Sequence, residues 1–249
     1  MKIAILGTGH IGKTLALTLS AAGHDVAVAN SRGPETIDPS LLVNGARAET
    51  TAQAVQDVDA VILSIPLLRI PDVASLIAAL PSETVIADTS NYYPVRDGQI
   101  AAIDAGQVES LWVTEQLGRP VVKIWNAIGS DSFAKKAKPP GDPDRLVIPI
   151  SADDERSRDV GMALVEDTGF DAVYAGTLAD SWRQQPGAPA YCTDLKRDEM
   201  PAALAAAEVD RLPKRRDLSF AAVVERMTGT GARDPDADYI VCLNRALFM

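Results

Sequence analysis

The fold is decided by the stretch from Lys2 to Ala29, KIAILGTGHIGKTLALTLSAAGHDVAVA. Its first apolar run, Ile3 to Leu6, ends in a turn rich in glycine. Apolar residues then recur at helical spacing from Ile11 to Ala22, and Gly23 follows as a helix terminator. A second apolar run, Val26 to Ala29, closes the segment. Strand, glycine turn, helix and strand within about 30 residues predict a βαβ unit.

The alternation of strand-like and helix-like segments continues beyond this unit. Strands with few polar residues, separated by helices, are typical of a parallel sheet that helices cover on both faces. We therefore predict an α/β fold with a doubly wound parallel sheet, followed by a smaller, mainly helical C-terminal region. The expected strands are 60–63, 84–87, 121–125, 146–150 and 171–174, and the expected helices are 34–42, 51–57, 66–80, 109–117, 153–167 and 200–209.

Composition narrows the class of protein. The chain has 249 residues, of which 47% are apolar, and a net charge of −10. This acidity disfavours binding to nucleic acid and to anionic membranes, and the short basic run Arg211 to Arg216 is predicted to be solvated surface. Cys192 and Cys242 lie far apart, and neither a leader nor an apolar stretch of membrane length is evident. We expect a cytoplasmic protein with no metal site.

The glycine turn matches two phosphate-binding patterns. Gly7 to Gly12, GTGHIG, fits G-x-G-x-x-G, the dinucleotide fingerprint. In that interpretation Gly7 permits the tight turn, Gly9 lets a pyrophosphate approach the backbone, and Gly12 allows close packing of helix and strand. The amide groups at the start of the helix then face the phosphates.

The same segment also fits the triphosphatase pattern G-x-x-x-x-G-K-T. Lys13 would then contact phosphates, Thr14 would ligate magnesium, and Asp88 would assist as a second magnesium ligand. Glycine at the first, third and sixth positions favours the dinucleotide, because the triphosphatase loop needs only the first and sixth.

The end of the second strand indicates which dinucleotide is bound. Asn30, Ser31 and Arg32 stand about 20 residues after the loop, where the adenosine ribose is read. An enzyme that uses NAD places a carboxylate there. A hydroxyl and a guanidinium suit the 2′-phosphate of NADP instead. The sequence therefore predicts NADP(H) as cofactor.

Polar residues also follow three later strands. Ser64, Ser90 with Asn91, and Asn126 each come just after an expected strand. The carboxyl ends of parallel strands meet at one edge of the sheet, where ligands bind. Serine and asparagine also favour turns for local reasons, so their clustering at one edge supports a binding role more than any one residue does.

Taken in order, these motifs resemble the NADPH-dependent reductases of the deazaflavin coenzyme F420. The resemblance covers most of residues 1–192. It rests on GTGHIG (7–12), NSRGPET (30–36), LSIPL (63–67), DTSNYYPVRDG (88–98), KIWNAIGS (123–130) and WRQQPGAPAYC (182–192). The tail beyond Cys192 has no counterpart that we can align.

The resemblance implies a set of cofactor contacts and two domains. Gly7, Gly9 and Gly12, with Thr8, His10 and Ile11, would line the pyrophosphate; Asn30, Ser31 and Arg32 the 2′-phosphate; Ser64, Ile65 and Pro66 the adenosine and its ribose; Asn91, Asn126, Ala127 and Ile128 the nicotinamide end. Residues 1–143 would form the NADP-binding Rossmann domain, and residues 144–249 a smaller domain on the acceptor side.

The implied reaction is hydride transfer between NADPH and F420 or a flavin-like acceptor, with no catalytic side chain. Two alternatives remain open. One is a reductase of a small carbonyl or imine, for which Tyr92, Tyr93 or Lys123 would donate a proton. The other is a non-catalytic protein that senses NADP(H). A homodimer is a further hypothesis that no stretch of sequence demonstrates.

Overall fold

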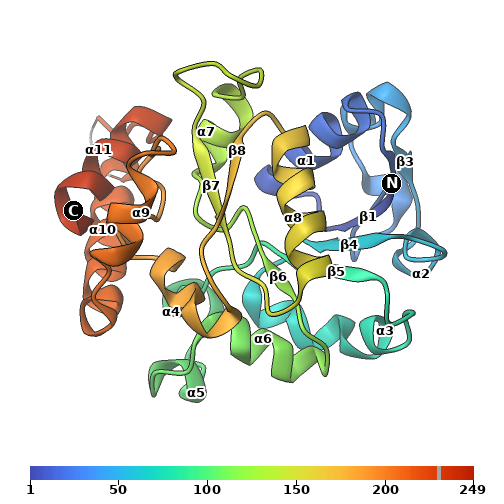
Figure 1. Ribbon diagram of the computed structural model, residues 1–249, viewed down its shortest axis with the longest axis horizontal. Coiled ribbons are helices and arrows are strands. Elements are labelled where there is room, and N and C mark those ends of the chain that lie inside the picture. The colour runs from blue at the N-terminus through green and yellow to red at the C-terminus, as the bar shows by residue number, and fades with distance from the viewer. Residues whose placement is uncertain (229–230) are drawn as a thin grey trace.

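The computed structural model describes residues 1–228 and 231–249, and its centre is a six-stranded parallel sheet (Figure 1). The strands lie in the order β3-β2-β1-β4-β5-β6. This is the doubly wound order of Rossmann folds, so the predicted fold class is confirmed. The strands are β1 (Lys2–Leu6), β2 (Asp25–Ala29), β3 (Arg47–Ala48), β4 (Ala60–Leu63), β5 (Val85–Asp88) and β6 (Val122–Lys123).

Alternation along the strands gives the sheet two buried faces. Ile3 and Ile5 of β1 pack into one apolar cluster, whereas Ala4 and Leu6 pack into the other. Helices α1 and α8 cover the first face, and α3 and α6 cover the second (Figure 1). The helices are α1 (His10–Ala21), α2 (Thr51–Ala54), α3 (Ala74–Ala78), α4 (Pro94–Asp97), α5 (Ala101–Asp104), α6 (Glu109–Leu117), α7 (Ser130–Lys135), α8 (Glu155–Asp167), α9 (Met200–Ala205), α10 (Leu212–Met227) and α11 (Ala237–Phe248).

Two of the expected helices, 51–57 and 200–209, end early, at Ala54 and Ala205, and two others are divided. The segment 66–80 is a 3₁₀ helix, Leu67–Val73, followed by the short α3, because Pro71 cannot donate a helical hydrogen bond. The segment 34–42 contains the separate 3₁₀ turns Pro34–Thr36 and Pro39–Leu41, each with proline at its start. Proline thus interrupts the helices expected before β3 and after β4, and the order of the strands is unchanged.

A second βαβ unit extends the fold. Strands β7 (Val147–Ile150) and β8 (Asp171–Tyr174) pair in parallel, and α8 connects them. An isolated bridge from Lys123 to Ser151 joins this pair to the edge of the large sheet. Leu164 and Val165 of α8 belong to the same apolar cluster as α1, so this unit shares the core of the first 143 residues. The division at 143/144 stays a prediction.

The C-terminal helices α9, α10 and α11 stand at the far side of the β7–β8 pair from β1 (Figure 1). Apolar residues of α10 and α11 pack against 182–192. Met200 and Ala203 of α9 instead pack in one cluster with Val147 of β7. We expected the basic run at the start of α10 to be solvated surface. This expectation is wrong for Arg215 and Arg216, whose side chains are each only 10% exposed. No helix among the described residues is long and apolar enough to cross a membrane.

A buried ion pair joins β5 to β6. Lys123 Nζ lies 2.8 Å from Asp88 Oδ2, and neither side chain is exposed to solvent. The ammonium also donates to the carbonyl oxygen of Ser90, and the Asp88 carboxylate accepts the backbone N–H of that residue at 3.0 Å. The pair therefore fixes the turn that leaves the carboxyl end of β5.

Replacing Lys123 with methionine should destabilise the protein by about 3–5 kcal/mol, because the substitution leaves the carboxylate of Asp88 buried and unpaired. Urea denaturation measures the change in the free energy of unfolding. The matched control is Lys135→Met, which breaks the exposed pair with Asp131 and should cost at most about 1 kcal/mol. Equal losses in the two variants would contradict the structural role of the buried pair.

Candidate functional site

The glycine turn is pressed against the end of β4. A Cβ on Gly7, whose φ is +112°, would lie 2.1 Å from the carbonyl oxygen of Ser64. A Cβ on Gly12 would lie 2.1 Å from the carbonyl oxygen of Gly7. Both positions therefore exclude any side chain, and their conformation sets α1 directly behind the carboxyl ends of β1 and β4.

Gly9 differs from its two neighbours because nothing lies within 4 Å of where its Cβ would be. It precedes the first turn of α1, so the open space lies at the N-terminus of a 12-residue helix. Unpaired backbone amides and the helix dipole favour an anion there. The turn has the shape that a dinucleotide pyrophosphate requires: closed where strand and helix touch, and open where a phosphate would approach.

A cleft of about 520 Å³ opens beside this turn. It lies at the carboxyl ends of β1, β2 and β4, the point at which the strand order reverses. Its lining brings together nine of the predicted site residues: Gly7, Thr8, Gly9, Asn30, Ser31, Arg32, Ser64, Ile65 and Pro66.

The structure adds lining residues that the sequence pattern did not single out: Leu6, Ala29, Thr51, Arg69, Asp72, Val73 and Leu76. Arg69 and Asp72 form an exposed ion pair at 2.6 Å within the 3₁₀ segment. Their spacing of three residues was the available signal, but it is common on helix surfaces and indicates no ligand.

Asn30 organises the loop that carries Arg32. Its Oδ1 accepts the backbone N–H of Arg32 at 2.8 Å, and its Nδ2 donates to Thr36 Oγ1 at 3.0 Å. Thr36 in turn donates to the carbonyl oxygen of Gly33 at 2.8 Å. The guanidinium of Arg32 is exposed and forms no ion pair with any described residue, whereas that of Arg69 pairs with Asp72. Arg32 is therefore the uncommitted cation of the cleft.

The predicted nicotinamide end lies along the edge at β5 and β6, outside the lining of this cleft. Asn126 Nδ2 donates to Asn91 Oδ1 at 3.1 Å and to the carbonyl oxygen of Gln184 at 2.8 Å. Gln184 Nε2 returns a hydrogen bond to Asn126 Oδ1 at 2.9 Å. Ala127 and Ile128 are buried, and the Ala127 carbonyl accepts the N–H of Cys192 at 2.8 Å. The side-chain amides of Asn91, Asn126 and Gln184 therefore join the loops after β5 and β6 to the segment that ends at residue 184.

His10 and Lys13 open onto a different hollow, of about 840 Å³, between α1, α7 and residues 234–236. Ile11 is half-buried, and Gly12 is buried under the turn. Thr14 Oγ1 donates to the carbonyl oxygen of His10 at 3.1 Å. The Thr14 hydroxyl is thus used inside α1, and Asp88 is committed to Lys123, so the magnesium ligands of the triphosphatase interpretation are not available.

Two of the three proposed proton donors are also committed elsewhere. Lys123 is wholly buried in its ion pair. The Tyr92 hydroxyl lies 2.9 Å from Asp104 Oδ1 and accepts the N–H of Ile100 at 3.0 Å. Tyr93 faces a cavity, where its hydroxyl lies 2.9 Å from that of Tyr191.

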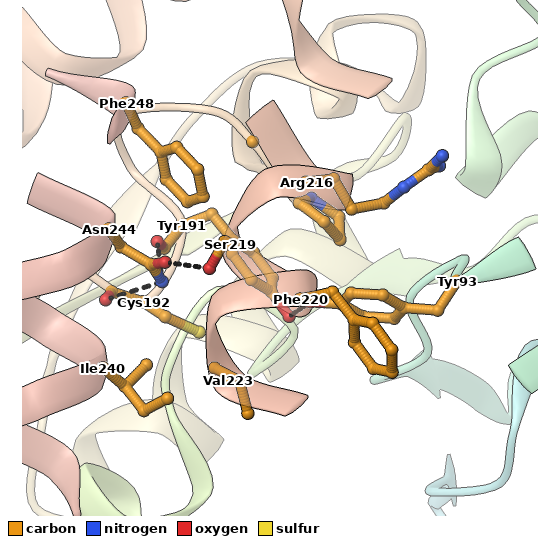
Figure 2. A pocket seen from close by; sticks show the side chains of 12 residues that line it. Tyr93, Tyr191, Cys192, Arg216, Ser219, Phe220, Val223, Ile240, Asn244 and Phe248 are labelled. Carbon is orange, nitrogen blue, oxygen red and sulfur yellow. Dashed lines mark hydrogen bonds between the residues drawn. The ribbon is translucent and has the colours of Figure 1, made fainter. Parts of the chain in front are cut away.

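This cavity, of about 190 Å³, is enclosed by aromatic and aliphatic side chains from α10 and α11 (Figure 2). Burial raises the pKa of Tyr93 and of Tyr191 well above the usual value, so both hydroxyls stay protonated at neutral pH. Burial also raises the pKa of the Cys192 thiol to about 12, so this buried thiol is uncharged at neutral pH. Among the described residues no cluster of three or more histidine, cysteine or acidic side chains is placed to hold a metal ion.

The glycines of the turn make contrasting predictions for stability. Gly12→Ala should cost about 1–3 kcal/mol, because its Cβ would overlap the carbonyl oxygen of Gly7. Gly9→Ala should cost only about 0.5 kcal/mol, since φ −70° and ψ −174° suit alanine and its Cβ meets open space. Chemical denaturation of both variants tests this, and a reversed order would show that the turn is built differently.

Comparison with known proteins supports the fold along most of the chain. The protein SMa0349 of Sinorhizobium meliloti has a solved structure that is 28% identical and aligns with a TM-score of 0.67, over 80% of this chain and 96% of that one. A candidate F420-dependent NADP-reductase from Arthrobacter sp. FB24 is 19% identical, with a TM-score of 0.56, over 95% and 98% of the two chains. The second likeness shows the fold alone.

Sequence comparison points to the N-terminal half. The Escherichia coli (strain K12) protein YjhV is 45% identical over 62 residues, which make up 25% of this chain, and this chain spans 45% of the length of that relative. Residues 2–92, from β1 to the turn after β5, match the model of a protein family described as NADP oxidoreductase, coenzyme F420-dependent. This matched segment contains the glycine turn and the Arg32 loop, and it is 91 of the 249 residues long.

Proposed function

We propose that this chain binds NADP(H) in the cleft at β1, β2 and β4 and acts as an oxidoreductase that exchanges a hydride between NADP(H) and F420 or a flavin-like acceptor. The observation that carries the proposal is one cleft that joins the open face of Gly9 to the uncommitted guanidinium of Arg32. The first feature suits a pyrophosphate, and the second suits the phosphate that distinguishes NADP from NAD.

The residues present fit this cofactor. The amides at the start of α1 would hold the pyrophosphate, and Ser31 and Arg32 the 2′-phosphate. Ser64, Ile65 and Pro66 would lie beside the adenosine and its ribose. Although the chain carries a net charge of −10, the carboxylate of Asp72, the acidic residue that lines this cleft, is neutralised by Arg69. The local charge therefore favours a phosphate.

When bound, NADP(H) supplies the hydride at its nicotinamide ring, so the protein needs to position and shield the reacting groups rather than act as a nucleophile. The Asn91, Asn126 and Gln184 side chains do so by locking the loops after β5 and β6 to residues 178–184. These amides satisfy one another, so they hold the edge rigid where we expect the nicotinamide.

The family match supports F420 as acceptor, but one observation favours a second candidate, a small carbonyl or imine. The cavity at Tyr93 and Tyr191 has about 190 Å³, whereas a cavity of about 150 Å³ holds one benzene ring. It is too small for three fused rings. It adjoins the nicotinamide edge through Ala127, which packs in the same cluster as Tyr191 and Cys192. A protonated tyrosine there is suited to donate a proton to a carbonyl oxygen.

We expect Arg32→Ala to weaken NADPH binding by about 10- to 100-fold, because a charge-assisted hydrogen bond is worth about 1.5–3 kcal/mol. NADH binding should hardly change, since NADH lacks the 2′-phosphate. Titration of NADPH and NADH fluorescence measures both affinities.

Arg47→Ala is the matched control, because Arg47 is an exposed arginine on β3 that pairs with Glu49 and lies outside the cleft. It should leave both affinities unchanged. Equal losses of NADPH and NADH affinity in Arg32→Ala would refute Arg32 as the residue that reads the phosphate.

An acceptor panel separates the two candidate reactions. Purified protein with NADPH is mixed in turn with F420, with flavins and with small cyclic ketones and imines, and NADPH oxidation is followed by absorbance. If F420 is the acceptor, Tyr93→Phe should leave its reduction nearly unchanged, because hydride transfer needs no donated proton from this hydroxyl. If a carbonyl is the acceptor, the same variant should lose about 100-fold in rate.

Affinity for NADPH without turnover of any acceptor would contradict the proposal of an oxidoreductase and favour a sensor of NADP(H). Absence of NADPH binding would refute the cofactor assignment itself.

A further inference from the structure

The side chain of Arg216 on α10 is largely buried, and its guanidinium pairs with Asp217. It is 10% exposed, and its Nε donates to Asp217 Oδ1 at 2.8 Å. Its carbon Cζ lies 5.3 Å from the ring centroid of Tyr92. Neither terminal nitrogen of the guanidinium has a hydrogen-bond acceptor among residues 1–228 and 231–249. These nitrogens are therefore free to donate to water or to an anionic ligand.

The guanidinium faces a second cavity. In Figure 2 the Arg216 side chain extends away from the aromatic cavity, with its nitrogens directed away from Cys192 and Asn244. Arg216 also lines a separate cavity of about 140 Å³ between α5, α6, the 3₁₀ segment 178–184 and α10. That cavity is the space into which the free nitrogens can donate.

Gln185 adds a second unsatisfied donor to the same cavity. The residue is 8% exposed and lines the cavity, and its Nε2 has no hydrogen-bond partner. Such groups are uncommon in folded proteins and call for a specific explanation. Two independent elements, α10 and the loop after residue 184, therefore bring free donors to one small space.

Glu109, at the start of α6, forms the opposite wall. It is 4% exposed, and its Oε2 accepts the N–H of Tyr92 at 3.1 Å. Burial raises the pKa of this carboxyl to about 7, against the opposing attraction of Lys123, so a large fraction is protonated at neutral pH. A protonated Glu109 is a hydrogen-bond donor rather than a negative charge.

We propose that this cavity is a binding site for a small carboxylate, or for the carboxylate end of a larger molecule, held by Arg216 and Gln185. A planar carboxylate matches the donor geometry of a guanidinium. The volume is close to that which holds a single benzene ring, so it accommodates a carboxylate with a few carbon atoms. The site is separate from the dinucleotide cleft, and neither proposal depends on the other.

A monocarboxylate fits this wall better than a phosphate dianion. Asp104 also lines the cavity, and its Oδ1 accepts the Tyr92 hydroxyl at 2.9 Å. A second negative charge on the ligand would meet Asp104 and ionised Glu109 with only Arg216 to balance them. A single negative charge, with Glu109 protonated, leaves only one negative charge in excess, which is less repulsive than the excess that a dianion would create.

The probe is sodium acetate, and isothermal titration calorimetry of the full chain measures its affinity, with sodium chloride at equal ionic strength as the blank. We expect saturable acetate binding that Arg216→Gln weakens at least tenfold. Gln185→Leu, which removes the second donor but keeps the charge, should weaken it several-fold. The matched control Arg211→Gln removes an exposed arginine that pairs with Glu208 outside the cavity, and it should change nothing.

The affinity for acetate should also decrease as the pH rises. An anion beside Glu109 raises the pKa of that carboxyl further, so binding takes up a proton, and the affinity for acetate should fall as the pH rises through 7. The ionisable groups that face Glu109 are Lys123, Asp88, Arg216, Asp104 and Tyr92. Glu109→Gln keeps a donor without the titration, and should bind acetate with little dependence on pH.

Two results would overturn the site: no saturable heat from acetate beyond the chloride blank, or equal affinities in the wild type, Arg216→Gln and Gln185→Leu. Circular dichroism of each variant verifies folding. If Arg216→Gln fails to fold, the acetate affinity of Gln185→Leu and the pH profile of Glu109→Gln still test the proposed site. Because NADPH fluorescence is measured separately, loss of acetate binding with intact NADPH binding refutes this site and leaves the cofactor proposal standing.

Discussion

The rest of the structure depends on the close approach of backbone to backbone where the glycine turn meets β4. Gly7 touches the carbonyl of Ser64, and Gly12 touches that of Gly7, at distances that leave no room for a side chain. This contact sets α1 behind the carboxyl ends of two central strands and leaves Gly9 facing open space. Packing at two glycines thus creates the unfilled position at the third, which is where binding is possible.

A second level of organisation comes from polar groups that satisfy one another beneath the sheet edge. The ion pair of Lys123 and Asp88 fixes the turn after β5, and the amides of Asn91, Asn126 and Gln184 bind that turn to the loop after β6. Such networks are rigid when complete and costly when a member is missing. Gln185 differs from these groups, because its Nε2 is buried without a hydrogen-bond partner.

The sequence predicted the sheet better than the helices around it. Ala60–Leu63, Glu109–Leu117 and Asp171–Tyr174 have the predicted bounds, because continuous apolar runs and clear helical spacing are local signals. Pro71 divided an expected helix, and α10 and α11 were not predicted. Nine cleft residues were identified from the glycine pattern, from the residues that follow the second and fourth strands, and from the resemblance to a known family. Lys123, Arg69 and Arg216 could not be interpreted correctly, because their partners lie far away or depend on tertiary packing.

The position of α10 has a consequence for how this protein can diverge. One helix supplies walls to both small cavities, through Phe220 and Val223 on one side and Pro213 on the other, and it makes no contribution to the lining of the dinucleotide cleft. Substitutions along this single helix can therefore reshape both small cavities without altering the lining of the cleft at β1, β2 and β4. The two regions of the molecule can vary independently of each other.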